Sequence, residues 1–219
     1  MERTISDHYL EMSSTNPEFM LIKDPDILKG ILLHRVAAQD SLGLVTRAIE
    51  TAESAHTGQK RKEGTPYILH PLRVSLRLLE EGSQPLEAVA VAVMHDTLED
   101  CPTLTTDDLN TNFGNEISQG VAALSKTIAS TGNKKDTDEY FNVLKSPSSP
   151  NYIRRIKVYD RIDNLYSILL LTTSPNNVGT KEFSDRYLVE TEKYFIELAS
   201  IDSSLQDKLD AALESVRAA

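Results

Sequence analysis

Apolar residues recur at helical spacing along most of this 219-residue chain. Between His70 and Gly82, for example, Leu72, Leu76 and Leu79 fall on one face of a helix. No segment shows the apolar and polar alternation of a half-buried strand, and no internal repeat is present. The pattern therefore predicts an all-α protein built as one compact helical bundle.

Start and stop signals divide this pattern into separate helices. Asp24 is placed to cap a helix with Pro25 at its first position, and Ser83 is placed to cap another. A glycine is a common helix stop, so Gly82 ends the helix before it. The predicted helices span residues 25–36, 41–55, 70–81, 83–101, 105–112, 115–127, 137–145 and 149–170, with two more in 180–218.

The polar segments set the expected domain organisation. Residues 1–23 are weakly patterned, and we expect a loosely structured N-terminal arm there. Residues 24–219 are then expected to form a single domain, a size that can bury a substantial core. The segment HTGQKRKEGTPYI, residues 56–68, has no helical period and is predicted to be a loop that carries basic residues.

The most hydrophobic segment of the chain ends in charge. Residues 88–94 read AVAVAVM, which is apolar around the whole helix and predicts a helix surrounded by others. His95 and Asp96 follow directly, and Glu99 and Asp100 follow four positions later. Carboxylates in the last turn of a helix oppose its macrodipole, so a divalent cation would stabilise them. The alternative is that the helix simply reaches the surface there.

Two further polar positions allow both a structural and a functional interpretation. His70 begins a predicted helix and is either a structural cap or a ligand. Asp160, Asn164 and Ser167 lie at i, i+4 and i+7 of the long helix, beside Lys157, where a solvated face explains them equally well.

Composition restricts the class of protein. The net charge of -10 argues against a general binder of nucleic acids or membrane surfaces, which would be basic. Cys101 is the only cysteine, which excludes an intramolecular disulfide and fits a reducing compartment. The polar N-terminus does not resemble a signal peptide, and no apolar stretch is long enough to span a bilayer. We therefore expect a cytoplasmic protein.

Three segments together resemble a known family. HTGQKRKEGTPYILHPL, VMHDTLED and IKVYDRIDN resemble, in this order, the hydrolase domain of the RelA/SpoT alarmone enzymes, within the HD phosphohydrolase superfamily. His70 precedes His95 by 25 positions, and Asp160 follows Asp96 by 64. The resemblance covers residues 45–170 and continues more thinly to about 197. It identifies the chain as similar to a small, stand-alone alarmone hydrolase.

The resemblance implies an all-α HD-domain helical bundle and an Mn²⁺-dependent reaction. That reaction removes the 3′-pyrophosphate from ppGpp or pppGpp and returns GDP or GTP, so the implied partner is a small nucleotide. Glu99 and Asp100 match the catalytic acidic pair. The implied metal ligands are His70, His95, Asp96 and Asp160, and the implied substrate-binding residues are Arg61, Lys62, Asn164, Ser167 and Tyr194.

The chain departs from the family pattern at two positions near Asp160. Tyr159 and Asp163 stand where the family usually has a small residue and a histidine, which leaves the nucleotide open. The alternatives are an HD phosphohydrolase acting on another nucleotide, such as ppApp or NADPH, and a non-catalytic nucleotide-sensing module. The sequence specifies no oligomeric state.

Overall fold

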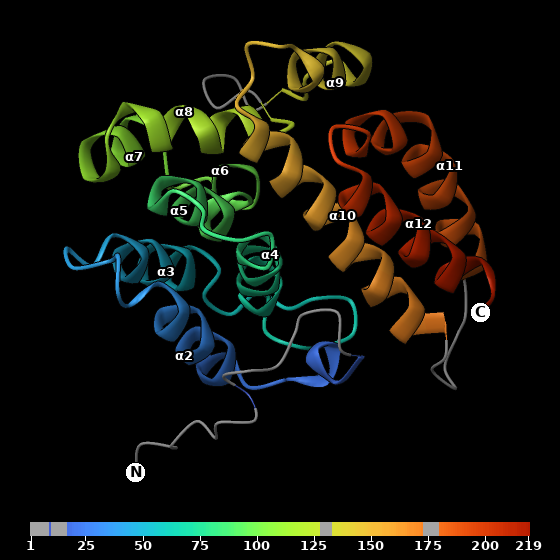
Figure 1. Cartoon of the computed structure of the whole chain (residues 1–219), viewed down its shortest axis with the longest axis horizontal. Coiled ribbons are helices and arrows are strands. Elements are labelled where there is room, and N and C mark those ends of the chain that lie inside the picture. The colour runs from blue at the N-terminus through green and yellow to red at the C-terminus, as the bar shows by residue number, and fades with distance from the viewer. Residues whose placement is uncertain (1–8, 10–16, 128–132, 173–179) are drawn as a thin grey trace. The chain divides into compact units, whose positions relative to one another are not determined.

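A computed structural model describes residues 9, 17–127, 133–172 and 180–219 of the chain. Within these ranges the secondary structure is helical, with two isolated antiparallel bridges and no strand, which confirms the all-α class (Figure 1). The elements are η1 (Pro17–Leu21), α2 (Pro25–Val36), α3 (Leu44–Ala55), α4 (Leu69–Leu79), α5 (Leu86–Met94), α6 (Thr97–Asp100), α7 (Thr106–Phe113), α8 (Asn115–Leu124), α9 (Thr137–Lys145), α10 (Asn151–Thr172), α11 (Thr180–Ala199) and α12 (Ser203–Arg217).

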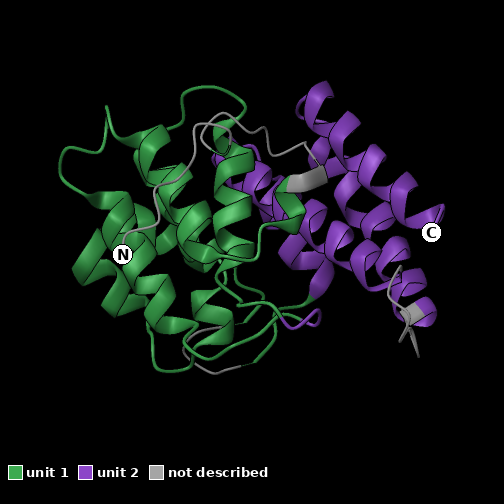
Figure 2. Ribbon diagram, turned by 90° about the horizontal axis from the view of Figure 1, so that it is seen from below, with its two compact units in different colours: residues 1–61, 65–136 green, residues 62–64, 137–219 purple. Residues whose placement is uncertain are grey.

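The helices fall into two compact units, shown in different colours in Figure 2. The first unit comprises residues 1–61 and 65–136, and the second comprises residues 62–64 and 137–219. The basic loop between α3 and α4 therefore contributes to both units, because its tip is grouped with the second. None of the described helices is long and apolar enough to cross a membrane.

In the first unit, α5 is the central helix. It packs against α3, α4 and α8, and every residue from 88 to 94 is completely buried. This confirms that the AVAVAVM run is a helix with neighbours around its circumference, as expected for a segment without a polar face. Burial of such a run is the main contribution that this helix makes to stability.

The polar residues after α5 do not continue that helix, contrary to the prediction. The helix ends at Met94 because side chains take its last carbonyl groups: Nδ1 of His95 lies 2.8 Å from the Ala92 oxygen, and the Thr97 hydroxyl donates to the Met94 oxygen at 2.8 Å. The four-residue helix α6 follows, with Asp96 at its N-cap position. The acidic residues thus begin a helix, where negative charge is favourable, rather than end one.

Several predicted helix starts are confirmed and others shift. Asp24 caps α2, because its carboxylate accepts from the backbone N–H of Asp26 at 3.1 Å. The next helix begins at Leu44 instead of Ser41, since the Asp40 carboxylate holds the N–H groups of Leu44 and Val45. Similarly, Pro85 rather than Ser83 precedes α5.

The end of the expected N-terminal arm is packed against the first unit. Residues 17–21 form η1, and the Phe19 side chain within it is completely buried. The Arg77 guanidinium of α4 lies 5.7 Å from the centre of the Phe19 ring. The apolar residues 19–22 therefore belong to the packed part of the chain, and the predicted arm extended too far toward the C-terminus. Residues 1–8 and 10–16 lie outside the described part.

In the second unit, α10 packs against α9, α11 and α12. Arg161 of α10 is buried and joins this helix to α11 in three ways. It pairs with Glu190 at 3.0 Å, donates to the Thr191 hydroxyl at 3.4 Å, and lies 3.8 Å and 4.0 Å from the ring centres of Tyr187 and Phe195. Cation–π contacts of this kind strengthen when they are desolvated.

Candidate metal centre

Two histidines and a carboxylate meet in the first unit where α4 approaches the end of α5. His70 is the second residue of α4 and His95 follows the last residue of α5, and both side chains are almost completely buried. Nε2 of His70 lies 3.5 Å from Oδ2 of Asp96, and Nε2 of His95 lies 3.3 Å from Oδ1 of the same carboxylate. One ring nitrogen of His70 lies within 4.8 Å of one ring nitrogen of His95.

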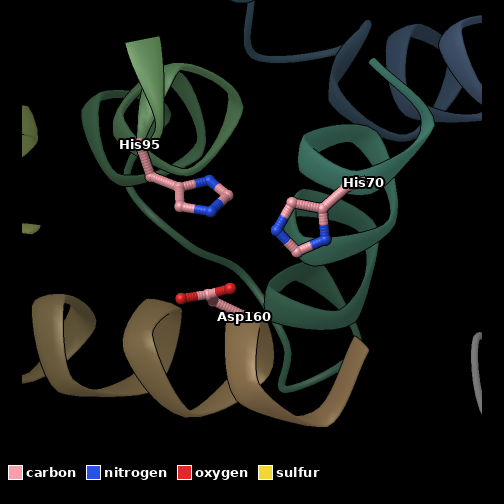
Figure 3. A group of neighbouring side chains, drawn as sticks. All are labelled: His70, His95 and Asp160. Carbon is pink, nitrogen blue, oxygen red and sulfur yellow. The ribbon is translucent and has the colours of Figure 1, made fainter. Parts of the chain in front are cut away.

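The orientation of the two rings is suited to metal binding. Figure 3 shows them side by side, and their centres are 5.1 Å apart with an interplanar angle of 64°. Nδ1 of His95 faces the carbonyl oxygen of Ala92, which only accepts hydrogen bonds, so Nδ1 carries the proton. When the ring is neutral, as in a metal ligand, its lone pair is therefore on Nε2, the atom that faces Asp96. A backbone carbonyl that fixes the tautomer in this way is typical of metal-binding histidines.

The separations also fit a metal site. Two ligand atoms held at about 2.1 Å from an ion and at right angles to each other lie about 3.0 Å apart. The two nitrogen–oxygen distances exceed this value by only a few tenths of an ångström. Imidazole and carboxylate donors together suit Mn²⁺, Zn²⁺ or Fe²⁺. The His70 ring faces the Asp96 carboxylate, which favours the interpretation of His70 as a ligand over that of a structural cap.

Asp96 is charged in this environment. Burial by itself would raise the pKa of its carboxyl group, but the neighbouring His95 and His70 rings hold that pKa well below its usual range. The Tyr67 hydroxyl also donates to Oδ2 of Asp96 at 2.8 Å. Tyr67 was not among the predicted site residues; it lies in the turn before α4, where its carbonyl oxygen accepts from the His70 N–H at 2.9 Å.

The predicted catalytic pair lies one turn of α6 beyond Asp96. Glu99 is half-buried, and its Oε2 atom accepts from the backbone N–H of Lys126 at 2.9 Å. Asp100 is exposed, and its carbonyl oxygen accepts from the Gln59 amide at 3.2 Å. The simple surface interpretation does not hold for Asp96 or Glu99, since each carboxylate has a specific partner.

In the second unit, Asp160 is buried on α10 and both of its oxygens have partners. Lys157 lies 2.9 Å from Oδ2, and the Asn164 amide donates to Oδ1 at 2.6 Å. Ser167, two turns further along the helix, is also buried. Asp160 and Ser167 are buried and Asn164 is half-buried, so these three residues do not form a solvated face. Figure 3 labels Asp160 on this helix.

The predicted substrate-binding cations rest against aromatic rings of their own units. The Arg61 guanidinium lies 5.5 Å from the centre of the Tyr67 ring, and the Lys62 ammonium lies 3.4 Å from that of Phe183. Arg61 begins a tight turn, closed by its N–H donating to the Thr65 oxygen at 2.9 Å. Gly64 has a φ of 84° in this turn, a conformation that favours glycine.

Tyr194 and Tyr159 have partners in the second unit. The Tyr194 ring stacks on Phe141 with a centre separation of 4.4 Å, and its hydroxyl donates to Asp138 at 2.6 Å. The buried Tyr159 accepts a hydrogen bond from Lys208 of α12 at 3.0 Å. The bulk that departs from the family pattern therefore fills space against α12.

Comparison with known proteins identifies the family of this chain and several relatives. A family model described as HD domain matches residues 48–177. A guanosine-3′,5′-bis(diphosphate) 3′-pyrophosphohydrolase of Aquifex aeolicus is 31% identical over 143 residues, which are 65% of this chain and 20% of the relative. A probable GTP pyrophosphokinase of Mycobacterium leprae is 28% identical over 170 residues, which are 76% of this chain and 21% of the relative.

A solved structure of a metazoan ortholog of SpoT, described as hydrolysing ppGpp, has a similar fold. Its TM-score is 0.64 at 24% identity, and the match covers 78% of this chain and 94% of that one. The chain spans about a fifth of the length of the two curated relatives named above. Because the family model covers more than half of the residues, the chain belongs to the HD domain family.

Proposed function

We propose that this chain is a metal-dependent hydrolase that removes the 3′-pyrophosphate from ppGpp and pppGpp. The observation that carries the proposal is the cluster of His70, Asp96 and His95, with an acidic pair one helical turn beyond it. The activity printed for the Aquifex relative supports the same reaction. The products are GDP or GTP and inorganic pyrophosphate.

The proposed metal is Mn²⁺, and the proposed ligands are His70, His95, Asp96 and Asp160. The first three residues supply nitrogen and oxygen donors at distances that suit a bound ion. Asp160 comes from the second unit and is supported by the resemblance of its segment and by its buried, polar setting on α10. The family match runs from residue 48 to residue 177 and so includes parts of both units, and the single domain over residues 24–219 stays a prediction.

In this reaction, water attacks the phosphorus atom bonded to O3′, and the bond between that phosphorus and O3′ breaks. A bound divalent ion would acidify this water and neutralise phosphate charge. Glu99 or Asp100 takes the proton from the attacking water, and the O3′ atom leaves as a hydroxyl group after it gains a proton. Glu99 suits this role because its carboxylate is fixed by the Lys126 N–H and remains half-exposed.

The substrate is strongly anionic, so it needs local positive charge on a protein whose net charge is -10. Arg61 and Lys62 supply it in the loop that precedes His70. An arginine can also stack its planar guanidinium on a base. Asn164, Ser167 and Tyr194 are proposed to contact the nucleotide by family resemblance. The cytoplasmic location stays a prediction.

The test is a substrate panel. Purified protein with Mn²⁺ is incubated with ppGpp, pppGpp, ppApp and NADPH, and the products are separated by anion-exchange chromatography. We expect GDP and GTP, each with one equivalent of pyrophosphate, and no turnover after chelation. Preferential turnover of ppApp or NADPH would move the assignment to another nucleotide. Binding of ppGpp without turnover would favour the sensing module.

A further inference from the structure

Tyr67 has contacts that neither the family resemblance nor the proposed reaction explains. Its hydroxyl donates to Oδ2 of Asp96 at 2.8 Å, and this same oxygen faces His70 at 3.5 Å. The other carboxylate oxygen, Oδ1, faces His95 at 3.3 Å. The phenol therefore fixes which edge of the carboxylate is presented to each histidine.

A fixed donor matters here because the terminal torsion of an aspartate is soft. The carboxylate plane of Asp96 can rotate over a broad range at little cost unless a partner holds it. A carboxylate oxygen only accepts hydrogen bonds, so the Tyr67 hydroxyl at 2.8 Å is the donor of this contact.

The ring that carries this hydroxyl is itself held in place. It stacks on His56 with centres 4.5 Å apart and an interplanar angle of 21°, and it meets the His70 ring edge-on at 6.0 Å. Its backbone N–H donates to the Gln59 carbonyl at 3.1 Å. Movement of the phenol is therefore opposed by contacts on two sides.

His56 is also fixed. The Gln59 amide nitrogen donates to the Asp100 carbonyl at 3.2 Å, so the Gln59 side-chain oxygen faces Nδ1 of His56 at 2.9 Å. His56 is 4% exposed, and burial lowers its pKa, which keeps the ring neutral. The loop before α4 thus places a rigid series of side chains against Asp96, ending in the Tyr67 hydroxyl.

We infer that Tyr67 is a positioning residue of the metal centre, which orients the Asp96 carboxylate through its hydroxyl and thereby sets metal affinity. This inference rests on the proposed function, because it assumes that Asp96 is a ligand. Loss of an outer partner of a metal ligand typically costs 10- to 100-fold in affinity. Tyr67→Phe is the suitable variant, since it keeps the ring and its stacking on His56 and removes only the hydroxyl.

The experiment titrates metal-free protein with Mn²⁺ alone and measures unbound Mn²⁺ by electron paramagnetic resonance. We expect Tyr67→Phe to raise the Kd for Mn²⁺ by about 10- to 100-fold. The Mn²⁺ concentration for half-maximal ppGpp hydrolysis should rise by the same factor, while kcat at saturating Mn²⁺ stays within a few-fold of the wild type. Tyr152→Phe, which removes a hydroxyl from a half-buried tyrosine of α10, is the matched control and should bind Mn²⁺ like the wild type.

The outcomes separate the two claims. If Tyr67→Phe binds Mn²⁺ with the wild-type Kd, the positioning role is wrong even where ppGpp is hydrolysed. If the wild type hydrolyses no nucleotide of the panel but Tyr67→Phe still weakens Mn²⁺ binding, the positioning role stands and the proposed reaction fails. A wild-type chain that binds no Mn²⁺ overturns both.

Discussion

The Oε2 atom of Glu99 accepts a hydrogen bond from the backbone N–H of Lys126 at 2.9 Å, which ties α6 to the segment after α8. This contact gives Glu99 a structural role beside its proposed chemical one. A substitution to alanine would remove both roles together, so its result could not separate them. A glutamine retains a side-chain oxygen that can accept from Lys126 and removes only the charge.

We expect Glu99→Gln to keep Mn²⁺ and substrate binding and to slow turnover by roughly 10²–10⁴-fold, because an amide cannot take the proton of water. Steady-state kinetics at saturating Mn²⁺ measures the change, and thermal unfolding checks that the fold persists. Glu116→Gln removes an exposed carboxylate of α8 and is the control. Wild-type turnover in Glu99→Gln would show that Glu99 acts only through the Lys126 contact.

The metal ligands are tested by removal of single donors. His95→Ala and Asp160→Asn should each lose bound Mn²⁺ and hydrolytic activity while the helical circular dichroism persists. Metal content after dialysis, measured by inductively coupled plasma mass spectrometry, is the direct readout. His34→Ala, at an exposed histidine of α2, should keep wild-type metal content. Unchanged metal in both ligand variants would contradict the assignment.

How far the sequence predicts this fold depends on the strength of each local signal. The AVAVAVM run and the Asp24–Pro25 start were predicted correctly, since continuous apolarity and a capped N-terminus have few alternative structures. The end of α5 was predicted wrongly. His95 and Thr97 bind the last carbonyl groups of that helix through their side chains, and such local competition does not alter the hydrophobic pattern.

The same reasoning applies to the site. The family resemblance implied that His70, His95 and Asp96 share a metal site, and the structure brings these three together. The contacts of His56 and Gln59 with Tyr67 and Asp100 were not foreseen, because they depend on how a loop without periodicity folds. A turn closed by a few hydrogen bonds leaves no periodic signal in the sequence.

The contacts of Arg161 predict that this residue stabilises the second unit. Its buried guanidinium joins α10 to Glu190 and to the rings of Tyr187 and Phe195. We expect Arg161→Met to lower the free energy of unfolding by about 2–4 kcal/mol, since the charge pair and the cation–π contacts are lost together. Urea denaturation measures the change. Arg186→Met, at an exposed position of α11, should change it by less than about 0.5 kcal/mol.

The lowered pKa of His56 leads us to expect that the free energy of unfolding depends on pH. Burial lowers its pKa in the folded chain, so below the unfolded value of about 6.5 the unfolded chain binds a proton that the folded chain does not. Its contribution to stability is therefore complete above that pH and is lost as the pH falls toward the folded pKa. One such group gives a slope of at most about 1.4 kcal/mol per pH unit.

His56→Gln should reduce this slope between pH 6.5 and 5, measured by urea denaturation of metal-free protein. The variant loses the stacking on Tyr67, so its stability is expected to be lower at all pH values, and only the slope is diagnostic. His34→Gln, at the exposed histidine of α2, should keep the wild-type slope. A wild-type slope in His56→Gln would show that His56 titrates normally in the folded chain.

The last prediction concerns Arg61 and Lys62, whose proposed role is to attract an anionic nucleotide to an acidic protein. Both residues belong to the loop that precedes His70, and each cation rests on an aromatic ring. Neither has been placed among the metal ligands, and their loss should leave Mn²⁺ content unchanged. Arg61→Ala and Lys62→Ala should each lower kcat/KM for ppGpp on the order of ten- to a hundredfold, because a charge-assisted contact contributes about 1.5–3 kcal/mol.

Lys60→Ala is the matched control, since Lys60 is an exposed cation of the same loop and carries the same charge. A general effect of net charge would lower kcat/KM equally in all three variants and would disappear at high salt. A specific effect would persist at high salt in Arg61→Ala and Lys62→Ala alone. If both of these variants hydrolyse ppGpp with wild-type kcat/KM, the loop does not bind the substrate, and the alarmone assignment then rests on the metal centre and the acidic pair.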